Sequence, residues 1–83
     1  MDRNYVLETI YSCVCSVLSC EIDALNEDSG FLSTFGWDSL AQVEIFCSVE
    51  EAFNIKFSNE LIEIITSIGI YADYVMNILI TNE

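Results

Sequence analysis

Apolar residues recur at intervals of three and four along most of this chain, and that spacing marks one face of an α-helix. A first helix is predicted from about Asn4 to Ser19, with Asp2 as its N-cap, and a second from the N-cap Asp38 through Phe53. The residues predicted to face inward are Val6, Ile10, Cys13, Val14, Val17 and Leu18 in the first helix and Ile45, Val49 and Phe53 in the second, with Gln42 and Phe46 at the edges of the second stripe.

The last third of the chain contains two more helical segments. A short third helix is predicted over about Asn59 to Ile65, with Ser58 as its cap. Ser67 is expected to cap a fourth helix, although Gly69 in its first turn costs about 1 kcal/mol relative to alanine. The inward positions of the fourth helix are Ile68, Tyr71, Ala72, Val75, Ile78 and Leu79. The sequence therefore predicts an all-α fold, a four-helix bundle with one short helix, in a single domain over residues 1–83.

The helical pattern stops between Cys20 and Trp37. Residues Asn26 to Gly30 form a polar turn cluster, so this segment is predicted to be a loop. Five apolar residues are expected to pin the loop to the core: Ile22, Leu25, Phe31, Leu32 and Phe35. A connection of this length is uncommon in a compact domain, and such loops are often functional.

The amino-acid composition excludes several classes of function. The 83 residues are 53% apolar and include 14 acidic but only 2 basic residues, for a net charge of −12. This charge excludes nucleic acid and anionic membranes as default partners and favours proteins with basic patches. The chain has no histidine, the commonest general base and metal ligand. We therefore expect no catalytic residues of its own, and any chemistry at this chain is expected to be supplied by another protein.

The cysteines and the first residues bear on the compartment. The start of the chain does not have the pattern of a signal peptide, and the longest uncharged stretch, Thr9 to Cys20, is too short to span a bilayer. We expect a cytoplasmic protein with reduced thiols. No metal site is predicted, because Cys13 and Cys15 are two apart on a helix and point away from each other. The cysteines are interpreted as small apolar side chains in or beside the core.

The segment Gly36-Trp37-Asp38-Ser39-Leu40 lies where the loop becomes the second helix. Ser39 falls in the first helical turn, where its hydroxyl is expected to be exposed. A phosphate attached there would lie near the unpaired N–H groups at the positive end of the helix dipole. Without a histidine nothing local would activate Ser39 as a nucleophile, so we interpret it as an acceptor that another enzyme modifies. The alternative is an ordinary capped helix start.

These residues resemble the acyl carrier and peptidyl carrier protein family, in which a D-S-L motif after a long loop opens the second of four helices. The resemblance covers most of the chain: the capped first helix, the acidic turn, GWDSLAQVEIF, the run Val49 to Ile55, and the last helix ending in Asp73-Tyr74-Val75. It implies that Ser39 receives 4′-phosphopantetheine from coenzyme A through a magnesium-dependent phosphopantetheinyl transferase. Asp38, Leu40 and Trp37 are the neighbours expected at this attachment site.

The resemblance also implies a mechanism. The thiol of the prosthetic group holds acyl, aminoacyl or polyketide units as thioesters, and the protein, itself no enzyme, brings them to successive enzymes. The implied partners are the transferase and acyl-loading and acyl-processing enzymes, such as an acyltransferase or ligase and a ketosynthase, with basic patches. The chain itself is expected to be a monomer.

One face of the second helix is a candidate docking strip. Leu40, Glu44, Cys47 and Glu51 are spaced four, three and four apart and so line one face. Two carboxylates would meet basic residues of partners, and Leu40 and Cys47 would add small apolar contacts. The alternative is a solvated acidic face. Cys47 departs from the larger hydrophobe usual in the family, and as an exposed thiol it could also promote dimerisation.

Two interpretations remain open for apolar residues near this site. Leu61, Ile62, Ile65, Ile68 and Tyr71 would form either a sleeve for an acyl chain or part of the core, and the core is favoured. Trp37 would be either a loop anchor or a contact for the arm and the transferase, and the anchor is the default.

The biosynthetic pathway is predicted from the segment after the second helix, where the sequence differs from carriers of fatty acid synthesis. Carriers of fatty acid synthesis usually have Ile-Pro-Asp after the second helix, whereas this chain has Ile55-Lys56-Phe57-Ser58. Together with the Trp before Asp38, this favours polyketide or mixed peptide–polyketide biosynthesis. Fatty acid synthesis and a peptidyl or D-alanyl carrier stay as alternatives. An alternative of another class is an acidic helical interaction module whose Ser39 is never modified.

Overall fold

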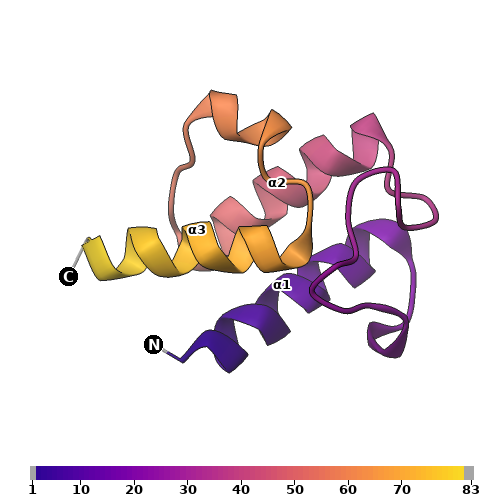
Figure 1. Ribbon diagram of the computed structural model, residues 1–83, viewed down its shortest axis with the longest axis horizontal. Helices are drawn as coiled ribbons and strands as arrows, with labels where there is room; N and C mark the ends of the chain where they lie inside the picture. Colours follow the sequence, from indigo (N-terminus) through magenta and orange to yellow (C-terminus); the bar gives the residue numbers. More distant parts are fainter. Residues whose placement is uncertain (1, 82–83) are drawn as a thin grey trace.

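The computed structural model describes residues 2–81 and is built from helices. Its elements, in chain order, are α1 (Arg3–Leu18), the 3₁₀ helix η1 (Ile22–Ala24), α2 (Ser39–Phe53), the 3₁₀ helix η2 (Asn59–Glu63) and α3 (Ile68–Thr81). α2 runs in roughly the opposite direction to α1, and α3 runs in the same general direction as α2 (Figure 1). The all-α prediction is confirmed. The predicted short third helix is present as η2, which is a 3₁₀ helix that ends at Glu63.

The predicted caps are confirmed at all three α-helices. The Asp2 carboxylate accepts from the Asn4 N–H of α1, and the Ser67 hydroxyl accepts from the Ile70 N–H of α3. Asp38 does the same for α2, as described below with its site. These side chains satisfy N–H groups that have no partner inside their own helix.

Ser58 occupies the N-cap position of η2, as predicted, but it does not cap the helix through its side chain, which makes no capping hydrogen bond. Instead its backbone carbonyl accepts from the Leu61 N–H at 3.0 Å, which is the i to i+3 bond of a 3₁₀ turn. The short turn is therefore closed by backbone alone.

The core lies where α1, α2 and α3 meet. The inward positions Val6, Ile10, Val14, Ile45, Val49, Ile68, Tyr71, Ala72 and Val75 are all 0% exposed, and Cys13 is 8% exposed. The outer members Val17, Leu18, Phe53, Ile78 and Leu79 are partly buried against them. Phe57 joins the core from the connection after α2, with its ring centroid 5.0 Å from that of Phe46 and 6.2 Å from that of Tyr71. Phe46 is thus buried and not an edge residue.

The loop before α2 is held differently from the prediction. Leu25 and Phe31 pack on the core as expected, but the side chains of Ile22, Leu32 and Phe35 are 51%, 76% and 101% exposed. These three residues do not pin the loop, and that part of the prediction is wrong. Apolar residue type does not by itself decide burial, because much of any folded surface is apolar.

Backbone hydrogen bonds attach this loop to the segment that begins α3. The Phe31 N–H donates to the Thr66 carbonyl at 2.9 Å, and the Ile68 N–H donates to the Ser29 carbonyl at 3.0 Å. Gly30 lies between them in an isolated antiparallel bridge with Ser67. A β-carbon at Gly30 would lie 1.9 Å from the Thr66 carbonyl oxygen, so only glycine permits this approach.

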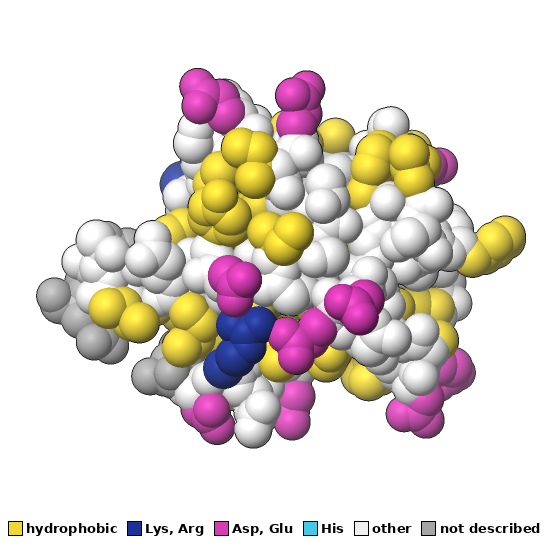
Figure 2. All heavy atoms as spheres, in the orientation of Figure 1, with side chains coloured by type: hydrophobic (Ala, Val, Ile, Leu, Met, Phe, Trp, Pro, Cys, Tyr) yellow, Lys and Arg dark blue, Asp and Glu magenta, His cyan; other side chains and the backbone are white. Residues whose placement is uncertain are grey.

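Most of the charged side chains on the face shown in Figure 2 are acidic. Arg3 at the start of α1 is an exception with a structural use, because its guanidinium forms ion pairs with Glu27 of the loop and Asp73 of α3, both at 2.7 Å. These bonds raise the pKa of Arg3, first through Glu27 and then through Asp73. Among residues 2–81, no helix is both long and apolar enough to cross a membrane.

Candidate functional site

Ser39 is the first residue of α2, and it is exposed as predicted. Asp38 precedes it in extended conformation, and its carboxylate accepts from the Ala41 N–H at 2.9 Å. The start of α2 lies at the end of the molecule opposite the start of α1 and the end of α3 (Figure 1). The Ser39 hydroxyl is thus held at a fixed place at one end of the structure, where a second protein can reach it.

The turn that leads to Ser39 is rigidly attached. Gly36 has a φ of +84°, a conformation that suits glycine. The Trp37 N–H donates to the Thr34 carbonyl at 3.0 Å, and the Trp37 carbonyl accepts from the Leu32 N–H at 2.9 Å. The indole ring is only 1% exposed. Trp37 is therefore a loop anchor, and the other interpretation is corrected, because no ring surface is left for the arm or the transferase to contact.

Gln42 fixes this anchor from the next turn of α2. Its side-chain oxygen accepts from the Trp37 indole N–H at 2.7 Å, and its side-chain nitrogen donates to the carbonyls of Ile62 and Ile65 at 2.9 and 2.7 Å. Gln42 is 5% exposed, so it lies inside the stripe and not at the edge where sequence placed it. A buried indole N–H usually has a hydrogen-bond acceptor, and this requirement of Trp37 could have indicated from the sequence that Gln42 faces inward.

An open cavity of about 360 Å³ adjoins Ser39. Its lining residues are Phe31, Ser39, Gln42, Val43, Ile62, Glu63 and Thr66. Of the five residues predicted as a sleeve, this cavity contains only Ile62. The core alternative is confirmed for Ile65, Ile68 and Tyr71, which are 0% exposed, while Leu61 packs on that core half-buried. The space beside Ser39 is therefore walled by α2, by η2 with Thr66 after it, and by Phe31 of the loop.

Tyr71 is a buried phenol without a described hydrogen-bond partner for its hydroxyl. Burial, followed by the nearby Cys47 and Cys13, raises the pKa of Tyr71 well above its ordinary value. The group therefore stays neutral and acts as core volume at every physiological pH.

The four residues of the candidate docking strip, Leu40, Glu44, Cys47 and Glu51, are all exposed. Val43, which sequence reasoning missed, is 46% exposed and adds an apolar contact beside Leu40. In Figure 2, apolar side chains come to the surface near the start of α2 and near η2. Glu50, on the same helix, is half-buried, and its carboxylate accepts from the Phe57 N–H at 2.8 Å.

Comparison with known proteins places this geometry in context. Residues 8–75 match the family described as "Phosphopantetheine attachment site", a span that includes Ser39 and all of α2. The chain is also 36% identical over 69 residues to a protein of Prochlorococcus marinus (strain MIT 9515) named "Acyl carrier protein". That similarity covers 83% of this chain and 86% of the relative.

Proposed function

Since the chain belongs to the acyl and peptidyl carrier family, which bears a 4′-phosphopantetheine prosthetic group, we propose that the Ser39 hydroxyl is where this group is attached. Proteins of this family are carriers and not catalysts. The observation that carries the assignment is the exposed Ser39 at the capped start of α2, inside the matched span. When bound, the group supplies a thiol that holds acyl units as thioesters.

The residues around Ser39 fit a phosphodiester. The first N–H groups of a helix have no partners within it, and the dipole makes this end positive, so a phosphate on Ser39 would be favourably placed. The Asp38 carboxylate accepts from the Ala41 N–H. Its negative charge is therefore partly neutralised by the positive end of the helix dipole. Val43 and Ile62 provide apolar walls in the cavity beside Ser39 for the part of the arm or cargo nearest the helix.

The chain itself contributes to attachment by positioning the Ser39 hydroxyl for the transferase. The Trp37–Gln42 hydrogen bond and the Asp38 cap hold the Ser39 oxygen in one place without a side chain that would take its proton. The chain has no histidine, and the Asp38 carboxylate beside Ser39 is bonded to the Ala41 N–H, so we assign the general base to the transferase. This division of labour is consistent with a substrate protein.

The strip on α2 is proposed as the surface that partners read. Glu44 and Glu51 offer exposed carboxylates to basic residues, and Leu40, which is 68% exposed, offers an apolar contact one residue from the attachment point. Opposite charges speed encounter and orient the partner, whereas the apolar contact adds affinity. The partners proposed are the transferase and enzymes that load and process acyl groups.

We favour a role in polyketide or mixed peptide–polyketide biosynthesis. The support is the segment Ile55-Lys56-Phe57-Ser58, which lacks the proline and acid usual in fatty acid carriers. Phe57 anchors this segment in the aromatic cluster with Phe46 and Tyr71. Fatty acid synthesis is the second candidate. A peptidyl or D-alanyl carrier is the third.

The test is the intact mass of the chain after incubation with coenzyme A, magnesium and a transferase of broad specificity. We expect a gain of one phosphopantetheinyl group, lost in Ser39→Ala and retained in Ser16→Ala, a matched control at an exposed serine of α1. No gain under conditions that modify a known carrier would instead support the unmodified acidic interaction module. Weighing the thioester trapped with the cognate enzymes would identify the cargo.

A further inference from the structure

Two of the four cysteines lie side by side where α1 ends. The Cys15 Sγ, in the last turns of α1, is 3.9 Å from the Cys20 Sγ, and the Cys20 thiol donates to it. Both side chains are half-buried, whereas Cys13 is buried in the core and Cys47 is exposed on α2. Cys15 and Cys20 are thus the two thiols that the fold brings into contact.

The backbone sets this contact. α1 ends at Leu18, and Ser19 adopts the left-handed conformation with φ 55° and ψ 43°. A left-handed residue at a helix end turns the chain back, so that the second residue after the helix meets the residue three before its last. Here those two residues are Cys20 and Cys15. The same reversal occurs at Asn54 after α2, where the corresponding residues are Ile55 and Glu50.

We propose that Cys15 and Cys20 are a site of reversible intramolecular disulfide formation, with a low-molecular-weight disulfide such as oxidised glutathione as the oxidant. The two sulfur atoms have to approach from 3.9 Å to about 2.05 Å. No partner molecule has to bring the thiols together. The site is separate from Ser39 and does not depend on its modification.

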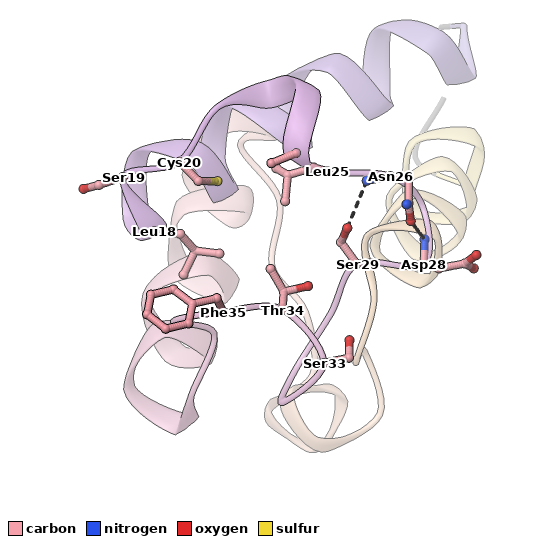
Figure 3. Close-up of a pocket in the computed structure, with 11 residues that line it drawn as sticks. Leu18, Ser19, Cys20, Leu25, Asn26, Asp28, Ser29, Ser33, Thr34 and Phe35 are labelled. Atoms are coloured by element: carbon pink, nitrogen blue, oxygen red, sulfur yellow. Dashed lines mark hydrogen bonds between the residues drawn. The ribbon is translucent and has the colours of Figure 1, made fainter.

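The solvent accessibility of the two thiols indicates which of them reacts with the oxidant first. Cys20 lines an open cavity of about 620 Å³ between the end of α1 and the segment 33–35. Its sulfur points into that space (Figure 3). Because the cavity is open to solvent, an oxidant reaches Cys20 there. Cys15 does not line the cavity and follows as the resolving thiol.

The exchange balances in atoms and electrons. The Cys20 thiolate attacks one sulfur of the oxidant, forming a mixed disulfide and releasing one molecule of reduced thiol. The Cys15 thiolate then attacks the Cys20 sulfur, which breaks the mixed disulfide and releases the second. The two protein thiols lose two protons and two electrons in all. The oxidant is reduced to two thiols.

Local chemistry makes the bond switchable and not permanent. Burial, then the hydrogen bond shared with Cys20 and the charges of Cys20 and Glu21, raise the pKa of the Cys15 thiol to about 11. In the reduced pair Cys15 is therefore a thiol at neutral pH, and its reaction as a thiolate accelerates as the pH rises. The ring closes only a short loop, so it removes little entropy from the unfolded chain and is easily reduced.

The test equilibrates the full chain with graded ratios of reduced and oxidised glutathione, blocks free thiols by alkylation and measures intact mass. In oxidising mixtures we expect a monomer that lacks two hydrogen atoms and takes up two fewer alkyl groups. Cleavage after Leu18, which lies between the cysteines, should leave the two fragments joined until a reductant is added. The Ser39→Ala variant repeats the measurement without a tether thiol.

Variants identify the pair. Cys15→Ser should stop at the mixed disulfide and gain one glutathione, Cys20→Ser should lose both products, and the control Cys47→Ser should oxidise like wild type. Thermal unfolding of each variant checks its fold, and the fragment experiment on the wild-type chain does not depend on any variant. The proposal is overturned if no ratio produces the internal bond, if the mass loss survives in Cys15→Ser, or if the only oxidised product is a dimer through Cys47.

Discussion

At the scale of single residues, the site depends on one buried amide. Gln42 bonds at once to the indole of Trp37 and to the carbonyls of Ile62 and Ile65, so it joins the loop, α2 and η2 around Ser39. Its three partners are polar groups that would otherwise be buried without hydrogen bonds. Leaving such a buried group without a hydrogen bond lowers the free energy of unfolding by more than the bond itself contributes.

We therefore expect Gln42→Leu to destabilise the fold by about 3 kcal/mol, since it strands an indole N–H and two carbonyls in the interior. Val43→Ala, at the exposed neighbouring position, should change stability by less than about 0.5 kcal/mol. Urea unfolding measures both. Equal effects of the two substitutions would show that the hydrogen bonds of Gln42 contribute nothing specific.

The sequence predicted some residues well because their role is local. Asp2, Asp38 and Ser67 cap helices through bonds to residues two or three positions away, and that spacing is visible in the chain itself. Gln42 was misplaced at the edge of a stripe because its partners Ile62 and Ile65 are about twenty positions distant. Spacing along one helix holds no information about a turn that packs later against it.

At the scale of elements, the three long helices were predictable and the connections were not. Amphipathic spacing fixes which face of α1, α2 and α3 is buried. The loop is positioned instead by backbone bonds to residues 66–69 and by the Trp37 anchor, and neither requires apolar side chains at Ile22, Leu32 or Phe35. Likewise, the 3₁₀ geometry of η2 results from packing on Gln42 and the core, which propensity alone cannot specify.

A prediction at this scale concerns α2 as a docking element. Reversing one exposed charge, Glu44→Lys, should raise the KM of the transferase for this chain about fivefold, because such a charge contributes about 1 kcal/mol, and kcat should change little. Glu8→Lys on exposed α1 alters the net charge equally and is the matched control. The effect of Glu44→Lys should shrink as salt rises. If Glu8→Lys acts as strongly, net charge and not the strip determines binding.

At the scale of the whole molecule, charge opposes compactness. A net charge of −12 is confined to a body of 36 × 26 × 19 Å, a distance range over which exposed charges repel at low ionic strength. The one described cation with ion pairs, Arg3, relieves this repulsion only where α1, the loop and α3 meet. The unfolded chain spreads the same charges farther apart, so repulsion lowers the free energy of unfolding.

Divalent cations should therefore raise the melting temperature more than a monovalent salt of equal ionic strength, by about 5 °C, which corresponds to roughly 1 kcal/mol for a domain of this size. Within residues 2–81 no cluster of acidic or cysteine side chains is arranged to hold a metal ion, so the effect should come from diffuse accumulation of counterions. Magnesium and calcium should then act alike and without sharp saturation. Differential scanning calorimetry with each salt measures this. A rise no greater than with the monovalent salt would show that crowding of carboxylates does not limit stability, and saturation by calcium alone would show a discrete site.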